Sequence, residues 1–410
     1  MAKIKAFKAL RPAKDVVQQV AELPYDVLDS NEARNIADGN EISFFHITKP
    51  EIDMGADINI YDESVYRAGS DNLSSFIEKG VMVKEDKAAL YLYTQVMDGR
   101  DQTGLVACVS IDDYLENRIK KHELTREDKE LDRTTHLDIL NANTGPVFLL
   151  FNEKGDKRKL FEEGMKVKPE NQFTAEDGIE HIVRKISDES LIKAFVEAFK
   201  DEILYIADGH HRAASAVRVG EKRRKENPDF TGEEEFNSFL VVIFPHEQLN
   251  ILAYNRAVKD LKGLSPDQFL DTLGEKFTVE KTGTKVPCGT REFSMYLENQ
   301  WYTLKPEFDV PSDPIDGLDV KILQDNLLDP TLGIKDPRKD TRISFIGGIR
   351  GTDELEKLVD SGACEVAFSM FPTTIEQLMK VSDVDGIMPP KSTWFEPKLR
   401  SGLFVHTLKD

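Results

Sequence analysis

Residues 207 to 212 combine side-chain types that suit phosphate chemistry, in the order Ala-Asp-Gly-His-His-Arg. They lie between the apolar run Ile203 to Ile206 and the helix-favouring run Ala213 to Val217, which predicts a turn from a strand into a helix. Gly209 allows a sharp turn and a close approach to a ligand, and the first free N–H groups of a helix attract anions. Arg212 adds a cation with forked donors. The segment predicts an anion site; an ordinary Asp-Gly turn with a hydrogen-bonded histidine pair is the alternative.

A second candidate group lies in the segment 119–126, where His122 and Glu123 are adjacent. His122 and Glu123 match the first two residues of a zinc-protease motif, but Arg126 stands where the second histidine is needed. Two imidazoles therefore cannot share one helical face. A carboxylate beside a histidine and two lysines suits a general base near a phosphate. The alternative is a solvated helix with ion pairs.

Other common sites find no support in the sequence. Neither a Walker A pattern nor a kinase glycine-rich loop occurs. His210 and His211 are neighbours that point in different directions on a helix or strand, so they do not converge on one metal ion. The three cysteines are far apart in the sequence, which favours buried thiols over a disulfide framework or a zinc site.

Composition narrows the class of protein. The 410 residues are 40% hydrophobic and 31% charged, the balance of a soluble globular protein, and the apolar runs are too short to span a bilayer. No sustained apolar region follows the first basic residues, so we expect a cytoplasmic location and no membrane partner. A formal net charge of −20 disfavours nucleic acid as a partner. Acidic proteins still bind nucleotides, with a few local cations and Mg²⁺.

Strand and helix signals alternate along the chain, which predicts an α+β architecture. A capping box at Asp29 and Glu32 predicts a helix, and Ile42 to Ile47 favours a strand. The runs Ala88 to Met97 and Gly104 to Ile111 predict a hairpin. Further on, the segment 112–133 is charged and favours a helix, whereas 152–171 is polar and typical of a linker.

The last third of the chain begins with a clear helix signal. Ser265 supplies a cap, Pro266 takes the first helical position and Gln268 completes a capping box. A helix is expected from Leu318 to Leu328, and strands are expected at Arg342 to Ile346 and Glu365 to Met370. The segment 388–398 combines rigid prolines with Lys, Ser, Thr and an aromatic pair, which predicts a defined loop.

Five motifs are spread over the whole chain: 7–12 (FKALRP), 23–27 (LPYDV), 120–133 (KKHELT followed by KE-x-DR), 207–212 (ADGHHR) and 388–398 (MPPKSTWFEPK). Together they resemble a family of bacterial and archaeal proteins of similar length, catalogued as a domain of unknown function. The turn motif is similar to the phosphate-binding element of the ParB/sulfiredoxin-like superfamily. Members of the family are related to kinases that convert free L-serine to O-phosphoserine with ATP or ADP.

The resemblance implies an organisation in three parts. Residues 111–260 are expected to form a ParB/sulfiredoxin-like nucleotide-binding core with a mixed sheet. An N-terminal α/β region, 1–110, and a C-terminal α/β region, 261–410, are expected to flank it, with a loop of the last region returning to the site.

Three activities of that superfamily can be compared. Sulfiredoxin places a cysteine directly before the His-Arg of its turn, whereas this chain has His210 there, so sulfinic-acid repair is disfavoured. ParB-type proteins carry a helix-turn-helix and a basic surface, which the acidic excess and the unrelated last third argue against. A small-molecule kinase is the favoured hypothesis. A non-catalytic nucleotide-binding regulatory protein is the alternative, and a ParB-like DNA-binding protein or nuclease is less favoured.

Carried over to this chain, the resemblance implies roles for particular residues. Backbone N–H groups from Gly209 to Arg212 would hold the phosphates of ATP or ADP, and Asp208 would orient the loop or help hold Mg²⁺. Glu123, beside His122, would accept the proton of the substrate hydroxyl. Positive charge near the transferred phosphoryl would come from Arg212 with one of two histidines, His210 or His211. Further phosphate contacts are expected from Lys391, Ser392 and Thr393.

Overall fold

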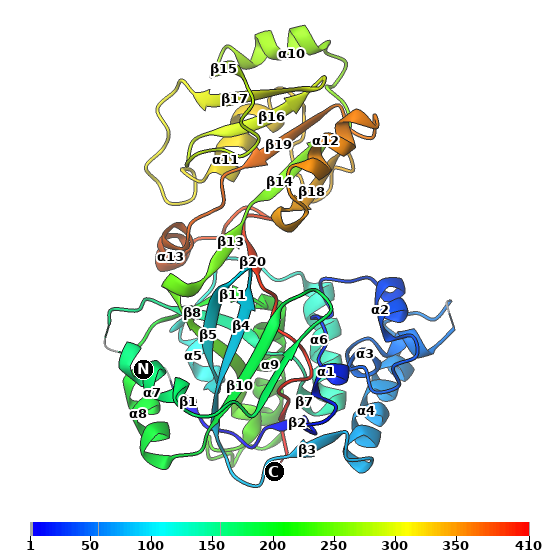
Figure 1. Cartoon of the computed structure of the whole chain (residues 1–410), viewed down its shortest axis with the longest axis vertical. Coiled ribbons are helices and arrows are strands. Elements are labelled where there is room, and N and C mark those ends of the chain that lie inside the picture. Colours follow the sequence, from blue (N-terminus) through cyan, green and yellow to red (C-terminus); the bar gives the residue numbers. More distant parts are fainter. Residues whose placement is uncertain (1–2, 56, 156, 410) are drawn as a thin grey trace. The chain divides into compact units, whose positions relative to one another are not determined.

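The computed structural model describes residues 3–55, 57–155 and 157–409. The chain forms two compact units (Figure 1): unit 1 comprises Met1–Leu249 and Pro397–Asp410, and unit 2 comprises Asn250–Glu396. The predicted regions 1–110 and 111–260 therefore lie almost entirely in one unit, because strands from both pair in the same sheet. Unit 2 is inserted between the two segments of unit 1.

The main element of unit 1 is a sheet of nine strands within the described residues, in the order β6-β11-β8-β12-β5-β4-β10-β9 with β1 beside β5. The β6–β11 and β8–β12 pairs are parallel and the other pairs are antiparallel, so the mixed-sheet α+β fold expected from the sequence is confirmed. The strands are β1 (Ile4–Lys5), β4 (Leu90–Met97), β5 (Arg100–Ser110), β6 (Ile119–Lys120), β8 (Val147–Phe151), β9 (Asn171–Thr174), β10 (Glu180–Ile186), β11 (Leu204–Asp208) and β12 (Ser238–Pro245).

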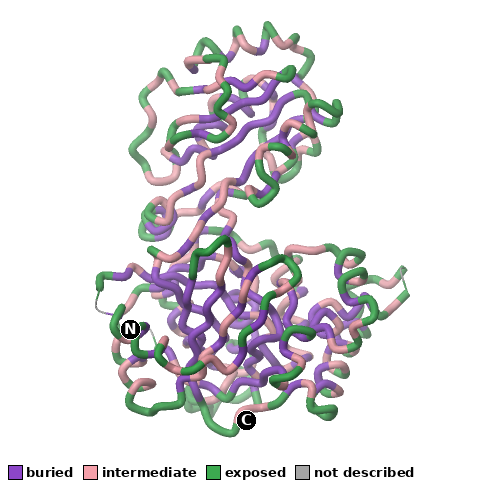
Figure 2. The backbone as a smooth tube through the Cα atoms, viewed as in Figure 1, coloured by how far each residue is buried: buried purple, intermediate pink, exposed green. Residues whose placement is uncertain are grey.

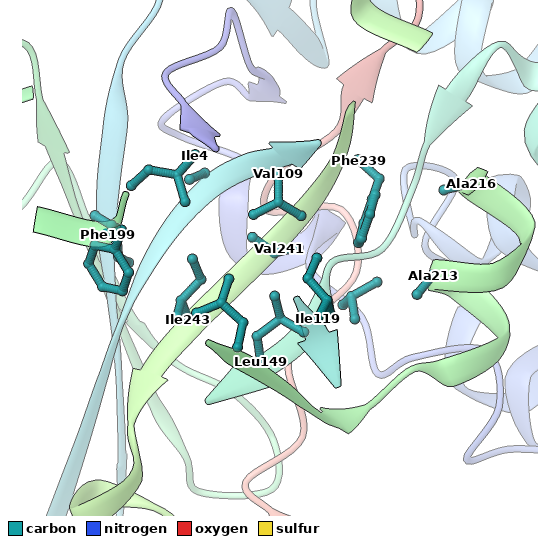
Figure 3. Packing of buried hydrophobic residues seen from close by; sticks show 14 of the residues in the cluster. Ile4, Val109, Ile119, Leu149, Phe199, Ala213, Ala216, Phe239, Val241 and Ile243 are labelled. Atoms are coloured by element: carbon teal, nitrogen blue, oxygen red, sulfur yellow. The ribbon is translucent and has the colours of Figure 1, made fainter. Parts of the chain in front are cut away.

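Side chains alternate between the two faces of this sheet, and both faces are covered. On one face, residues such as Val109, Leu149 and Ile243 pack against Phe199 of α8 (Glu189–Phe199) and Ala213 of α9 (His210–Glu226) (Figure 3). On the other face, Tyr91 and Tyr93 contact the ring of Phe404, with centroids 5.1 and 6.0 Å away. The returning segment 397–409 thus covers part of the sheet, and β8 and β12 are buried along their whole length (Figure 2).

The parallel pairing of β6 with β11 positions the site. Ile119 lies opposite Leu204 and Lys120 opposite Tyr205, so the two strands run in the same direction and end at the same edge of the sheet. The residues that follow β6 therefore lie beside the end of β11. This arrangement corrects the continuous helix expected over 112–133: buried Ile119 belongs to the sheet core, and the helical signal is divided between α5 (Ile111–Leu115) and α6 (Glu127–Leu140).

Two other expectations about unit 1 are wrong. Ile42 to Ile47 is not a strand, because α3 (Phe45–Thr48) occupies its second half. Phe44 and Ile47, three residues apart, lie in one apolar cluster, so packing at a helical spacing outweighs strand propensity. The linker-like segment 152–171 contains α7 (Arg158–Met165), whose Phe161 packs edge-on against Phe195, with ring centroids 5.6 Å apart.

The expected hairpin is confirmed as β4 and β5, and the Asp29 capping box is confirmed at the start of α2. The remaining elements of unit 1 are β2 (Leu10–Pro12), α1 (Val17–Val20), α2 (Ser30–Ala37), η1 (Pro50–Asp53), α4 (Glu63–Glu78), β3 (Met82–Lys84), β7 (Ala142–Asn143), η2 (Glu235–Asn237), η3 (His246–Gln248) and β21 (His406–Thr407).

Unit 2 contains an antiparallel sheet in the order β15-β17-β16-β19-β14-β18 and a separate pair, β13 with β20. The Ser265 capping box and the two late strands are confirmed, and the expected helix 318–328 is α11 followed by a π-helical turn, η4. The elements of unit 2 are β13 (Asn250–Leu252), β14 (Tyr254–Val258), α10 (Pro266–Leu273), β15 (Phe277–Thr282), β16 (Phe293–Leu297), β17 (Gln300–Pro306), α11 (Asp319–Leu323), η4 (Gln324–Leu328), β18 (Ile343–Gly347), η5 (Gly348–Arg350), α12 (Asp353–Asp360), β19 (Val366–Met370), α13 (Ile375–Asp383) and β20 (Trp394–Glu396).

Across the described residues, no helix of either unit has both the length and the apolar character that crossing a bilayer requires.

Candidate functional site

The turn from β11 into α9 has the geometry expected from its sequence. Asp208 ends the strand, His210 begins the helix, and Gly209 between them has φ +91° and ψ 32°, a left-handed conformation that L side chains rarely adopt. A Cβ at Gly209 would also lie 3.1 Å from Nε of Arg212. Only glycine satisfies both constraints. Gly209 is also the N-cap residue of α9, and it has no side chain that could cap the helix.

Arg212 is held inside unit 1 by three oxygen acceptors. Its Nη1 donates to the carbonyl of Pro146 at 2.6 Å, and its Nη2 lies 3.3 Å from a carboxylate oxygen of Asp26 and 3.3 Å from one of Asp208. Burial alone would lower the pKa of the guanidinium, but the two carboxylates raise it above its ordinary value. Arg212 is therefore a permanent cation that ties the turn to the loop before β8 and to the N-terminal segment that contains Asp26.

Asp208 lies between two cations. Its carboxylate is 3.8 Å from Nζ of Lys398 and 3.3 Å from Nη2 of Arg212. Burial would raise the pKa of Asp208, but Lys398, Arg212 and then His210 lower it to about 2, so the carboxylate is ionised at neutral pH. The sequence did not indicate Lys398 or Asp26 as site residues, although both lie within motifs that carry the family resemblance.

Both histidines of the turn hold the loop that carries Glu123. Nε2 of His210 accepts a long hydrogen bond, 3.5 Å, from the backbone N–H of His122, and Nε2 of His211 accepts one of 3.0 Å from the backbone N–H of Arg126. Because each Nε2 is an acceptor, the ring proton of each neutral imidazole is on Nδ1. Burial lowers the pKa of both rings, so the positive charge in the turn comes from Arg212 and Lys398.

This arrangement brings Glu123 to the turn. Its Oε2 lies 3.7 Å from Nδ1 of His210, the nitrogen that carries the ring proton, and its side chain is 54% exposed. A short movement would therefore form a hydrogen bond from His210 to this half-exposed carboxylate. Glu123 lies in the loop between β6 and α6, and not on the helix expected from the sequence.

His122 has a different environment from Glu123. Its side chain is 2% exposed, and its ring packs edge-on against that of His210 with centroids 4.5 Å apart. Burial lowers its pKa to about 4. Its Nδ1 is buried and forms no hydrogen bond within the described residues. His122 therefore supports His210 from within the core, and its role as a direct participant in chemistry stays a prediction.

Three other predicted residues belong to unit 2. Nζ of Lys391 lies 5.3 Å from the ring centroid of Tyr254, and the Ser392 hydroxyl donates to the carbonyl of Pro389 at 2.6 Å. Thr393 directly precedes β20. The role of Lys391, Ser392 and Thr393 as phosphate contacts stays a prediction.

The carboxylates of the site suit a particular mode of metal binding. In the described parts of the chain, no three His, Cys, Asp or Glu side chains are grouped so that they could hold a metal ion by themselves. Mg²⁺ is commonly held by one or two carboxylates together with substrate phosphates and water. Asp208 therefore fits Mg²⁺ that is bound to a phosphate group, and does not form a protein cage for the ion.

Comparison with known proteins places the chain in a family. Residues 4–321, more than three quarters of the chain, match the family described as Protein of unknown function (DUF1015). The chain belongs to this family. The family resemblance carried by the motifs is thereby confirmed. No curated protein matches the chain.

Several solved structures resemble this member of the DUF1015 family at low identity. A free serine kinase in complex with AMP is 13% identical, with a TM-score of 0.36 over 71% of this chain and 86% of that chain. A conserved hypothetical protein from Pyrococcus furiosus is 13% identical, with a TM-score of 0.35 over 72% and 93%. SbnI with a C-terminal truncation, from Staphylococcus aureus, is 13% identical, with a TM-score of 0.39 over 74% and 89%.

Proposed function

We propose that this chain is a nucleotide-dependent phosphotransferase that acts on the hydroxyl group of a small molecule, with free L-serine as the first candidate. The observation that carries the proposal is the position of Glu123. An accessible carboxylate is held beside His210 at the start of α9, where ionised Asp208 and two cations also lie. A base, fixed cations and an uncapped helix start are the parts that phosphoryl transfer requires of a protein.

Glu123 is proposed as the general base. The proton on Nδ1 of His210 would stabilise and orient the ionised carboxylate, which would accept the proton of the substrate hydroxyl. His211 and His210 are positioning residues in this scheme, because they fix the two ends of the loop that presents Glu123. A general base of this kind contributes about 10²- to 10⁴-fold to a rate.

The turn is proposed as the phosphate site. The backbone N–H groups from Gly209 to Arg212 would bind phosphate oxygens, and Lys398 and Arg212 would offset negative charge. Asp208 would hold Mg²⁺ through its ionised carboxylate. The acceptor oxygen would form a bond to the terminal phosphorus of ATP or ADP, and the bond from that phosphorus to the nucleotide would break, so that ADP or AMP leaves. The start of α9 supports this assignment, since its N-cap residue, Gly209, has no side chain that could occupy the free N–H groups of the first turn.

The test is ³¹P NMR of the purified protein with Mg²⁺, L-serine and either ATP or ADP. We expect a new phosphomonoester signal with one of the donors, and loss of that signal with Glu123→Gln while nucleotide affinity changes less than about threefold. Glu226→Gln is the matched control, because its side chain is 57% exposed and lies at the far end of α9. Nucleotide binding without turnover of any hydroxyl acceptor would instead identify a regulatory nucleotide-binding protein.

A further inference from the structure

Arg212 also lines a small pocket within unit 1. The pocket has a volume of about 30 Å³, enough for about two water molecules or one small polar group. Its wall includes residues from five separate segments: Tyr25, Arg133, Thr144 with Gly145, Arg212 and Ser401. The first two and Arg212 belong to three different motifs of the family resemblance, and no role in the proposed chemistry has been assigned to the pocket.

The polar wall offers several donors to one small group. Arg133 lies over the ring of Tyr25, with Cζ 4.1 Å from the ring centroid, and its Nε and Nη2 both contact Asp132 at 2.9 Å. Among the hydrogen bonds of the described residues, none involves Nη1 of Arg133 or the hydroxyls of Thr144 and Ser401. The side chain of Ser401 is only 2% exposed. These donors match a ligand group that accepts several hydrogen bonds.

We propose that this pocket binds the carboxylate of the phosphoryl acceptor, which assigns the acceptor to the small α-amino or α-hydroxy acids. The proposal rests on the proposed kinase function. A carboxylate matches the donors because it accepts several hydrogen bonds in one plane and pairs with a guanidinium. The lining guanidiniums of Arg133 and Arg212 disfavour an ammonium group. The volume admits a carboxylate group and excludes a nucleotide.

The pocket and the turn share Arg212. Its aliphatic stem contributes to the pocket, since Cδ lies 3.8 Å from the position of a Cβ at Gly145, and its Nη2 contacts Asp208 at the turn. Nη2 also contacts Asp26, whose side chain is 35% exposed. A carboxylate in the pocket therefore has an acidic side chain nearby that suits the α-ammonium group of an amino acid. This pairing favours a zwitterion such as L-serine over a simple hydroxy acid.

The first experiment compares L-serine with L-serinamide, which has the same hydroxyl and ammonium groups and no carboxylate. Binding of each compound to the full-length protein is measured by isothermal titration in the presence of AMP. We expect L-serinamide to bind about 10- to 100-fold more weakly, the loss typical of hydrogen bonds to a charged group. Equal affinity for the two compounds, or no binding of L-serine, glycine or L-lactate, would overturn the proposal.

Variants locate the binding to the pocket. Arg133→Lys keeps the charge and loses the fork, and Gly145→Ala places a methyl group 3.3 Å from Oγ of Ser401, where it narrows the pocket. Both should weaken L-serine binding about tenfold or more and leave AMP binding unchanged. Arg158→Ala is the control, because it removes one arginine at an exposed site on α7. Melting temperatures show whether each variant folds. If Arg133→Lys does not fold, L-serine binding by Gly145→Ala tests the pocket assignment.

The two proposals fail separately. Phosphoryl transfer to serine with an unchanged KM in the Arg133 and Gly145 variants would overturn the pocket assignment and leave the kinase function in place. Carboxylate-dependent binding that the two variants abolish, without phosphoryl transfer from ATP or ADP, would overturn the kinase function and support the pocket as a binding site.

Discussion

Arginine side chains in the two units of this chain have different kinds of partner. All eight histidines lie in unit 1, and residues 250–396 contain none. In unit 1, buried Arg212 contacts the carboxylates of Asp26 and Asp208, which raise its pKa. In unit 2, Arg256 is 3% exposed, donates to the backbone carbonyls of Tyr254 and Lys391, and lies 5.4 Å from the ring centroid of Phe345. Burial lowers its pKa to about 10.

The type of partner therefore separates a charged site from a structural one. Carboxylates on either side of Arg212 create a fixed pattern of opposite charges, which a ligand with its own charges can join. Carbonyl groups satisfy the hydrogen bonds of Arg256 without neutralising it, so its charge opposes burial. Residue type and burial do not make this distinction, because both residues are arginines with largely buried side chains. The comparison supports unit 1 as the location of the proposed chemistry.

The largest expected difference between the units is the loss of stability when Arg212 or Arg256 is replaced by methionine. Arg212→Met leaves two carboxylates without their cation and should lower the free energy of unfolding by about 3 kcal/mol or more. Arg256→Met removes a cation that has no carboxylate partner, and the added apolar contact should hold the loss below about 1.5 kcal/mol. Urea unfolding of both variants at pH 7 measures the two losses. Equal losses would show that carboxylate partners do not decide the outcome.

Lysines provide a similar comparison for activity. Lys398 lies 3.8 Å from Asp208 in unit 1, and Lys391 lies over Tyr254 in unit 2. If phosphoryl transfer takes place at the turn, Lys398→Met should lower kcat/KM about 10- to 100-fold, the effect of losing one charged hydrogen bond in the transition state. Lys391→Met should change it less than about threefold. The reverse order would make the loop before β20 the phosphate contact.

Stability should fall in mildly acidic solution because of the histidines of unit 1. Burial lowers the pKa of His122 to about 4, below the value of about 6.5 in an unfolded chain. The unfolded state therefore binds the proton first as pH falls, and the stability present above pH 6.5 is lost progressively down to about pH 4. At pH 5 the loss from His122 is about 2 kcal/mol. Asp208 does not contribute in this range, because its lowered pKa affects stability only below about pH 4.

The measurement is the difference in unfolding free energy between pH 7 and pH 5, compared for the natural chain and His122→Asn. The substitution should reduce the difference by about 2 kcal/mol. Other titrating groups cancel in this comparison, including Glu22, whose pKa burial raises to about 7. Hydrogen exchange at the amides of β19, in unit 2, tests whether the loss of stability at pH 5 belongs to unit 1. Faster exchange in β19 alone at pH 5 would contradict that assignment.

The smallest expected effect concerns the backbone of the turn. Gly209→Ala should cost about 1 to 2 kcal/mol from its positive φ, with an added loss from the contact between the new methyl group and Arg212. Gly39→Ala is the control, because Gly39 has φ +75° and nothing within 4 Å of its would-be Cβ. The difference between the two variants in thermal unfolding measures the contact with Arg212. No difference would mean that the guanidinium moves aside freely.

Local signals carried the predictions that succeeded. Capping residues fixed the starts of α2 and α10, alternation and turn residues fixed the hairpin, and the apolar run before Asp208 fixed the turn. The predictions that failed depended on distant contacts. The two-residue strand β6 is too short to recognise in a charged segment, and it exists because buried Ile119 pairs beside Leu204.

The site was predictable in part for the same reason. Residue types and the family motifs indicated the turn and Glu123, and the structure brings them together through β6 and β11. Asp26 and Lys398 also lie within family motifs, but the sequence does not link them to the turn, since their proximity to Arg212 and Asp208 depends on how segments far apart in the chain fold back onto the sheet. A neutral state of the two histidines could not be predicted either, because burial determines it.

The insertion of unit 2 has a consequence for synthesis on the ribosome. Lys398 and Phe404 belong to the segment that returns to unit 1 after the 147 residues from Asn250 to Glu396. At about 5 to 20 residues per second, translation of that insertion takes roughly 7 to 30 s. During this time the sheet of unit 1 lacks the ring that covers Tyr91, and the turn lacks its lysine. The nascent chain therefore exposes an incomplete core and an unfinished site until translation has passed residue 404.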